Sequence, residues 1–264
     1  MNMISLTAFD LSIAALLVVF LAVLGLWLQL GVSRQLLIAA VRTTVQLLLV
    51  GYILKILFET VHLGYMTVIV TVMLLFAGRE VMARQTNPYK GWWGFGMGTL
   101  SMFISTFTVT LLALTVIINN DPWYTPQYAI PLLGMMLGNT MTGIALGLER
   151  LTQAAREQRK QIEAQLMLGF SSQQAVAKIR RQSMRYGMIP IINSMAAAGL
   201  VSLPGMMTGQ ILAGSPPLEA VKYQILIMFL ITAGTGFGTV VAVVLGSRRL
   251  FDKRERLRLD RLRK

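Results

Sequence analysis

Long uncharged stretches recur along the chain and are separated by short polar connections. They predict seven membrane-spanning helices, at about residues 8–31, 36–58, 63–79, 94–118, 126–148, 186–214 and 223–246. These stretches are about long enough to cross roughly 30 Å of hydrocarbon as helices. The pattern therefore predicts an all-α polytopic membrane protein, with one transmembrane domain over residues 1–247 and a basic tail over residues 248–264.

Lysine and arginine are concentrated in alternate connections, which predicts the orientation of the helices. The connections after the first, third and fifth spans carry a basic excess, and so does the tail. The second connection holds Lys55 and Glu59, which cancel, and the fourth and sixth carry no basic excess. Because basic loops stay on the cytoplasmic side, we expect the N-terminus outside and the C-terminus in the cytoplasm.

Pro204 interrupts the sixth predicted span. A proline inside a helix removes a backbone hydrogen bond and clashes with the preceding turn. We expect this element to be kinked or broken near Pro204. Irregular backbone at membrane depth requires cover from protein or a water-filled cavity, so residues 202–214 are a candidate functional break. The alternative is a proline kink that only improves packing.

Composition narrows the class of protein further. Of 264 residues, 55% are hydrophobic and 13% are charged, with no cysteine and one histidine, His62. A disulfide, a thiolate metal site and an imidazole cluster are therefore excluded. The net charge of +13 is carried by loops and by the tail, where nine basic residues face three acidic ones between Arg248 and Lys264. This placement favours contact with membrane lipid rather than with nucleic acid.

The connection at residues 149–185 is the only sizeable polar segment before the tail, and it predicts two helices joined by a turn. Ile162 and Leu166 fall four residues apart among charged neighbours, which is typical of an amphipathic helix. Gly169 suits a left-handed helix end, and Ser171 with Gln174 forms a capping box for the next helix.

The second of these helices carries Val176 and Ile179 on one side, with Lys178, Arg180 and Arg181 beside them. Such a short element has the shape to dock into a groove on a soluble partner. A basic helix lying on anionic lipid is the alternative.

One motif in this connection resembles the EAA loop of ABC transporter permeases, which carries the coupling helix that contacts the ATP-binding subunit. It consists of Glu163-Ala164-Gln165, Gly169 and Ile179. The chain departs from the family pattern at Gln182 and Ser183, where a proline is expected. The resemblance implies that the contact residues for the ATPase are Glu163, Ala164, Gly169, Ser171, Val176, Ile179 and Arg180.

Further segments resemble the FetB family of permeases, the membrane half of an iron-exporting ABC transporter with plant relatives linked to aluminium tolerance. The resemblance is carried by residues 127–139, 202–210 and 217–224, together with Arg42, Gln46 and Gly51-Tyr52. It implies a transport subunit, not an enzyme, that pairs with a separate ATPase as two permeases and two ATPases. It also implies a bacterial cytoplasmic membrane, and ATP and Mg bound by the partner, with no cofactor on this chain.

The residues agree with a separate ATPase. The chain contains no Gly-x-x-x-x-Gly-Lys-[Ser/Thr] phosphate loop. Gly234, Gly236 and Gly238 lie in a predicted span, where we expect them to allow close helix packing.

Two segments, from Gly134 to Asn139 and from Gly205 to Gln210, share the pattern Gly-Met-Met-x-Gly-[Asn/Gln]. One interpretation is helix packing at glycines four residues apart. The other is a translocation path at a symmetric dimer interface, with Met135, Met206 and Met207 as metal contacts and with Asn139, Gln210, Pro204, Arg42 and Gln46 along the path. Arg42 also lies shallow enough in its helix to extend to the headgroups. Met136 is left out, because other aliphatic residues occupy this position in the family pattern.

The chemistry of these side chains does not select iron. Thioethers suit Cu(I), whereas Fe(II) prefers imidazole, carboxylate and water. The only carboxylate inside a predicted span is Asp10, near one end. Iron therefore rests on the resemblance. The alternatives are an ABC permease for another cargo, such as a nucleotide sugar bound by Arg42, and a membrane receptor that needs no ATPase.

Overall fold

The computed structural model describes residues 7–59, 62–119 and 121–263. In this part of the chain the regular structure is helical, and only isolated bridges join extended segments. The chain divides into two compact units. The first comprises residues 1–61 with 212–214, and the second comprises residues 62–211 with 215–264.

The first unit is a pair of helices, α1 (Ala8–Trp27) and α2 (Ser33–Glu59). α1 begins with a capping box in which Thr7 and Asp10 bond each other's backbone N–H groups. Gly25 and Ser33 lie close together, since a Cβ on Gly25 would stand 2.8 Å from Ser33 Oγ. Most side chains on both helices are exposed and apolar, as expected of helices that face lipid.

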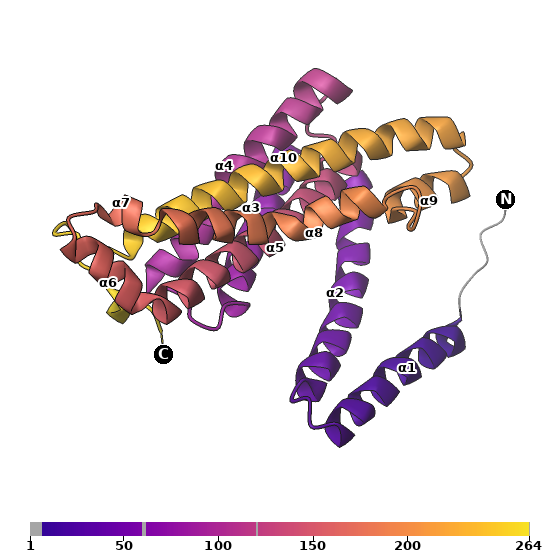
Figure 1. Ribbon diagram of the computed structural model, residues 1–264. Coiled ribbons are helices and arrows are strands. Elements are labelled where there is room, and N and C mark those ends of the chain that lie inside the picture. The colour runs from indigo at the N-terminus through magenta and orange to yellow at the C-terminus, as the bar shows by residue number, and fades with distance from the viewer. Residues whose placement is uncertain (1–6, 60–61, 120, 264) are drawn as a thin grey trace. The chain divides into compact units, whose positions relative to one another are not determined.

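The second unit contains the remaining helices (Figure 1). They are α3 (Leu63–Ala83), α4 (Trp92–Leu112) with a π-helical end (Ala113–Ile118), α5 (Pro126–Glu157), α6 (Arg159–Met167), α7 (Ser172–Ala175), α8 (Ala177–Ala197), α9 (Gly205–Leu212), α10 (Pro217–Arg249) and a 3-10 turn (Leu259–Arg261). The last residue of α9 is grouped with the first unit. α5 and α10 pack along each other, and α4 and α8 contact both of them.

α5 and α8 cross with their backbones in contact. A Cβ added to Gly143 would lie 3.0 Å from the carbonyl oxygen of Gly187, and a Cβ added to Gly187 would overlap the carbonyl oxygen of Gly143. α10 approaches α5 at Gly238, where a Cβ would lie 2.6 Å from Thr140 Cγ2. Only glycine allows these approaches, so the three helices form the centre of the second unit.

Within the described residues, six helical segments are long and apolar enough to cross a membrane: Ala8–Trp27, Ser33–Lys55, Leu63–Ala83, Trp92–Ile118, Pro126–Glu157 and Pro217–Arg249. They match six of the predicted spans, although α5 continues nine residues past the predicted end at 148 and α10 begins six residues before 223. The predicted helical membrane protein is therefore confirmed.

The sixth predicted span, 186–214, is not one helix. α8 ends at Ala197 and α9 begins at Gly205. Between them, Ala198 is extended and Gly199 has a φ of 86°. The carbonyl of Pro204 accepts a hydrogen bond from the Thr208 N–H at 3.1 Å, so this proline precedes the first turn of α9. The predicted break is confirmed, and α8 and α9 replace the single span.

The polar connection at 149–185 does not form a separate protruding pair of helices. α5 continues into it as far as Glu157, and α8 begins within it at Ala177. The predicted turn is confirmed locally: Gly169 has a φ of 88°, and Ser171 and Gln174 form both bonds of the capping box. Only α6 and the single turn of α7 lie between the two long helices, because the hydrophobic faces of this region belong to the core of the unit.

The basic tail is folded against the second unit, which its charge alone did not predict. Leu250 and Leu262 are fully buried, and Phe251 is 7% exposed. The main chain of this segment bonds the α3–α4 connection: Lys90 N–H donates to the Arg261 carbonyl at 2.8 Å, and Arg263 N–H donates to Pro88 at 2.9 Å. We call residues 250–263 the C-terminal segment.

Tyr89 joins the α3–α4 connection to α10 by a hydrogen bond. Its hydroxyl donates a hydrogen bond of 2.8 Å to the carbonyl of Gly246, and its side chain is 1% exposed. Burial raises the pKa of the Tyr89 hydroxyl above its usual range, so it remains a donor. The α3–α4 connection, the end of α10 and the C-terminal segment are thereby joined.

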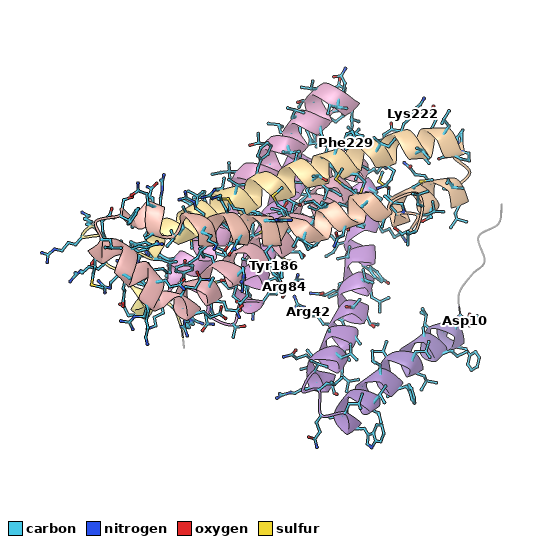
Figure 2. The ribbon with its side chains drawn as sticks, viewed as in Figure 1. Asp10, Arg42, Arg84, Tyr186, Lys222 and Phe229 are labelled. Carbon is cyan, nitrogen blue, oxygen red and sulfur yellow. The ribbon has the colours of Figure 1, made fainter. Side chains whose placement is uncertain are left out.

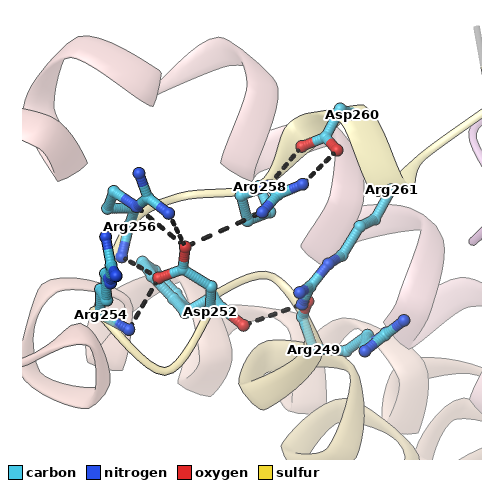
Figure 3. A network of polar contacts seen from close by, with 8 residues as sticks. Arg249, Asp252, Arg254, Arg256, Arg258, Asp260 and Arg261 are labelled. Atoms are coloured by element: carbon cyan, nitrogen blue, oxygen red, sulfur yellow. Dashed lines mark hydrogen bonds and ion pairs between the residues drawn. The ribbon is translucent and has the colours of Figure 1, made fainter.

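Asp252 organises the turn within the C-terminal segment (Figure 3). Its carboxylate accepts hydrogen bonds of 2.9 Å from the backbone N–H groups of Arg254 and Arg256, and it forms an ion pair of 2.8 Å with the Arg256 guanidinium. The backbone bond from Arg256 is the main reason why the pKa of Asp252 is lowered to about 2. The turn therefore depends on an ionised carboxylate.

Acid is expected to loosen the C-terminal segment. The pKa of Asp252 falls from 3.8 to about 2 on folding, so its stabilising contribution is complete above pH 3.8 and is lost as the pH falls through about 2. A fluorophore attached to a Lys253→Cys variant, which would hold the sole cysteine, should show falling anisotropy in this range.

An added Asp252→Asn change should give low anisotropy already at neutral pH. Asp260, whose pKa is also lowered to about 2 by the Arg258 hydrogen bond, titrates in the same range. An unchanged acid transition in the Asp252→Asn variant would therefore assign the transition to another group and contradict the prediction.

Candidate functional site

The first predicted path segment lies in the N-terminal half of α5. Met135 is half-buried, and Asn139 is exposed with its Nδ2 donating to the Met135 carbonyl at 2.8 Å. Met136 is fully buried and packs against Gly234 of α10. The two adjacent methionines thus have different surroundings, and only Met135 is partly accessible.

The second path segment forms α9 and the residue before it. Pro204, Met206, Met207 and Gln210 are half-buried, and the Oε1 atom of Gln210 is buried with no hydrogen-bond partner among the described residues. α9 lies at the opposite end of the second unit from α6 and α7 (Figure 1). Met135 also lies in the half of α5 farther from α6. No hydrogen bond within the described ranges joins the two segments, so their shared site stays a prediction.

The glycines of these segments do not make the close packing that their spacing suggested. A Cβ on Gly138, Gly205 or Gly209 would have no neighbour within 4 Å in the described chain. The crossings lie instead at Gly143, Gly187 and the α10 glycines. Packing at Gly234 and Gly238 is confirmed, whereas Gly236 meets only Met188, at 3.7 Å. Spacing alone did not distinguish open glycines from packed ones.

Arg42 and Gln46 lie one turn apart on α2, in the first unit, and both are exposed. Figure 2 labels Arg42 of the first unit, and it also labels three residues of the second unit, Arg84, Tyr186 and Phe229. The proposed share of Arg42 and Gln46 in the path stays a prediction.

No conventional metal centre is found within residues 7–59, 62–119 and 121–263, where no three His, Asp or Glu side chains gather. His62 caps α3, its Nδ1 accepting a hydrogen bond of 3.2 Å from the Gly64 N–H. The carboxylate and imidazole ligands that Fe(II) prefers are therefore not grouped in this part of the chain.

The EAA-like residues lie at the other end of the second unit. Glu163 forms an ion pair of 2.8 Å with Arg159 on α6, and Ala164 is exposed on the same helix. Gly169 is exposed in the turn, where its positive φ reverses the chain between α6 and α7. Ser171 caps α7 and is half-buried. The side chains of these residues are at least partly exposed. Their contact with a partner stays a prediction.

Two of the predicted contact residues are not accessible. Val176 is 1% exposed and Ile179 is 3% exposed, and both belong to the hydrophobic core. Val176 ends α7 and directly precedes α8, so its side chain is turned into the junction of the two helices. Arg180, one turn further, is half-buried. The apolar side of this helix therefore packs inside the protein instead of against a partner.

Three apolar side chains nearby are exposed, and they were not among the predicted contact residues. Met167 is 82% exposed, Leu168 77% and Phe170 50%, all at the α6–α7 turn. The sequence feature that could have predicted them is the apolar run Met167-Leu168-Gly169-Phe170, which directly follows a polar helix. We call Met167, Leu168 and Phe170 the apolar tip. Exposed apolar groups clustered at the end of a polar helix are typical of a protein-binding site.

A groove of about 890 Å³ borders the apolar tip. One wall comes from α6 and the turn, including Leu166, Met167 and Phe170. The other wall comes from residues 254–257 of the C-terminal segment. The tip and the groove together form an accessible surface at the basic end of the second unit.

Comparison with known proteins identifies relatives over nearly the whole chain. The chain is 42% identical to the UPF0014 membrane protein slr1647 of Synechocystis over 88% of both proteins. It is 31% identical to the Escherichia coli protein named "Probable iron export permease protein FetB", over the full length of both. It is also 30% identical to the Arabidopsis thaliana protein ALUMINUM SENSITIVE 3, over 88% of this chain and 83% of the plant protein.

No solved structure gives a significant match. The family model described as "Uncharacterised protein family (UPF0014)" matches residues 8–251, which include all the helices that are long and apolar enough to span a membrane. These matches confirm the resemblance inferred from the sequence motifs. The chain is therefore a multi-pass membrane protein that belongs to the UPF0014 family, the family that includes the FetB permease.

Proposed function

We propose that this chain is the permease subunit of an ABC transporter that exports iron across the cytoplasmic membrane, driven by a separate ATP-binding subunit. The observation that carries the proposal is the apolar tip, exposed next to an EAA-like sequence in a protein related to one named "Probable iron export permease protein FetB". The functional complex contains two permeases and two ATPases, and ATP and Mg are bound by the ATPases.

The proposed orientation places the apolar tip in the cytoplasm and the N-terminus outside. Arginine and lysine residues are concentrated at this end of the second unit, in α6, in the start of α8 and in the C-terminal segment. At the opposite end, Lys222 near the start of α10 forms an ion pair of 2.7 Å with Glu219 (Figure 2). This asymmetry supports the proposal through the positive-inside rule.

The connection between α7 and α8 supplies a route for coupling. Val176 is both the C-cap residue of α7 and the N-cap residue of α8, so the two helices follow each other without a linker. A displacement of the turn at Gly169 would be passed along α8 to the break at residues 198–204. In the proposed cycle, ATP closes the two ATPases, residues 169–181 transmit the motion, and the Pro204 region switches the path between inward-facing and outward-facing states.

The proposed path uses weak and transient contacts. Met135, Met206 and Met207 supply thioethers, and Asn139 and Gln210 supply amides, with Arg42 and Gln46 at the interface between the two permeases. An exporter does not need a tight site, because a cargo that is bound strongly would not be released. The Oε1 atom of Gln210 is buried and has no hydrogen-bond partner in the part of the chain that the structure describes, which supports a role for this amide in the path.

Iron export is expected to lower the iron content of metal-loaded cells. Cells that express this chain with its ATP-binding subunit should contain less iron than cells that express a Gly169→Pro variant. Manganese, cobalt, nickel, copper and zinc should stay unchanged. Elemental mass spectrometry of washed cells measures all six metals in one experiment.

A fall in another metal would keep the ABC permease but replace iron as cargo. No change in any metal would reject a metal cargo and would direct the test to organic anions such as nucleotide sugars.

Purification in mild detergent tests the class of protein independently. Recovery of an ATP-binding cassette ATPase in a one-to-one ratio is expected, and its repeated absence would favour a receptor.

A further inference from the structure

We propose that the C-terminal segment forms half of the docking surface for the ATP-binding subunit and that Arg254 binds a carboxylate of that subunit. This inference rests on the proposed function and names a contact outside the EAA-like sequence. The occupant of the groove is an apolar side chain of the ATPase with an acidic residue beside it. The groove's two walls, its attachment and its charge support this assignment.

The groove has an apolar lining with a charged rim. Leu166 and Leu257 are half-buried and pack against the hydrophobic core, whereas Met167 and Phe170 stand exposed beside them. The wall opposite the apolar tip is the turn formed by residues 254–257. A side chain that enters between them contacts apolar groups from two segments that are more than 80 residues apart in the sequence.

The C-terminal wall is held in place by bonds at both sides of the groove. The Glu255 carboxylate accepts a hydrogen bond from the backbone N–H of Ser172, at the start of α7. Asp252 holds the backbone N–H groups of Arg254 and Arg256 (Figure 3). The wall and the turn that carries the apolar tip are therefore joined directly, and a partner meets a surface that is already ordered.

Arg254 gives this surface its free positive charge. The guanidinium of Arg256 is paired with Asp252, and that of Arg258 is paired with Asp260 at 2.9 Å. Across the groove, Arg159 is paired with Glu163. The exposed side chain of Arg254 has no ion pair among the described residues. A carboxylate of the ATPase at the rim of the groove would give Arg254 the ion pair that the other arginines already have.

The lining favours a protein over a lipid surface. Glu163, Glu255 and Gln174 line the same groove, and an anionic headgroup layer would be repelled by the two carboxylates. A protein segment with one acidic side chain can face Arg254 while its apolar neighbours fill the groove. Lys253, the next basic residue, is exposed but does not line the groove, so it provides a matched control.

The test compares Arg254→Glu with Lys253→Glu in the full-length chain in detergent. The probe is the ATPase that copurifies with the wild-type chain, and its Kd is measured at low and at high salt. Arg254→Glu is expected to raise the Kd about tenfold at low salt and by less at high salt. Arg254→Gln should have a smaller effect, and Lys253→Glu should leave the Kd within about twofold.

Three results would overturn the inference. An unchanged Kd for Arg254→Glu would remove Arg254 from the contact, while the proposed function would stand. Equal weakening by Lys253→Glu would indicate general attraction to basic charge, as a lipid-facing segment would also give. If the wild-type chain binds no ATPase, both the inference and the proposed function fail. An unchanged protease cleavage pattern in both variants shows that the segment is still folded.

Discussion

Replacing Gly187 with leucine is expected to prevent folding of the second unit. A Cβ at this position would overlap the carbonyl oxygen of Gly143 and would stand 2.7 Å from Thr239 Cγ2, so α5, α8 and α10 would all have to move apart. Overpacking a core commonly costs about 1–3 kcal/mol, and here one obstacle is backbone that cannot change rotamer. The yield of monodisperse protein in detergent should fall at least about tenfold.

Gly209→Leu is the matched control for this change. Gly209 also lies within a helix, but a Cβ there would have no neighbour within 4 Å in the described chain. The same leucine should therefore leave the yield and the elution profile of the detergent-solubilised chain unchanged. Equal yields from the Gly187 and Gly209 variants would show that the crossing of α5 and α8 is not required for folding.

Gly169→Pro is expected to abolish transport while the chain still inserts and folds. Gly169 has a φ of 88°, whereas proline requires about −65°. Proline would also remove the hydrogen bond of 3.1 Å from the Gly169 N–H to the Leu166 carbonyl. The turn that presents the apolar tip would change shape, so ATP-dependent iron efflux should fall to the background rate. Efflux from loaded vesicles and the stimulated ATPase rate are the two measurements.

Gly169→Asn separates backbone geometry from other effects of substitution. Asparagine adopts the left-handed conformation more readily than other residues with a side chain, and Gly169 is exposed with no neighbour within 4 Å of an added Cβ. This variant should retain most of the efflux. Full efflux by Gly169→Pro would remove the α6–α7 turn from the coupling route, and loss of efflux in both variants would argue for a requirement for glycine itself.

Local features of the second unit were predictable from the sequence because short-range physics determines them. The uncharged stretches located the long helices, and Ser171 with Gln174 formed the predicted capping box. Gly169 took the predicted left-handed conformation. The break before α9 also followed from one residue, Pro204, although it begins earlier, at Ala198. Each of these depends on neighbours within a few positions.

Features that depend on distant partners were not predictable. The motif around Val176 and Ile179 showed an apolar side, but only the fold shows that this side belongs to the core. The charge of the C-terminal segment predicted only a basic cytoplasmic tail beside membrane lipid. Its order comes from contacts with Pro88, Tyr89 and Lys90 of the α3–α4 connection, more than 150 residues away in the sequence. The shared site of Met135 and Met206 stays a prediction, because it depends on an assembly of chains that one sequence does not specify.

The crossing at Gly143 and Gly187 has a consequence for the order of assembly. α5 and α8 are separated only by α6, α7 and short turns, so their contact closes a shorter loop than the contact between α5 and α10 at Thr140 and Gly238. We therefore expect this hairpin to pair early, as soon as both helices have been synthesised. α10 follows later along the chain and packs on α4, α5 and α8 together. In this sequence of events α10 completes the bundle, and until then a gap remains where its glycines will fit.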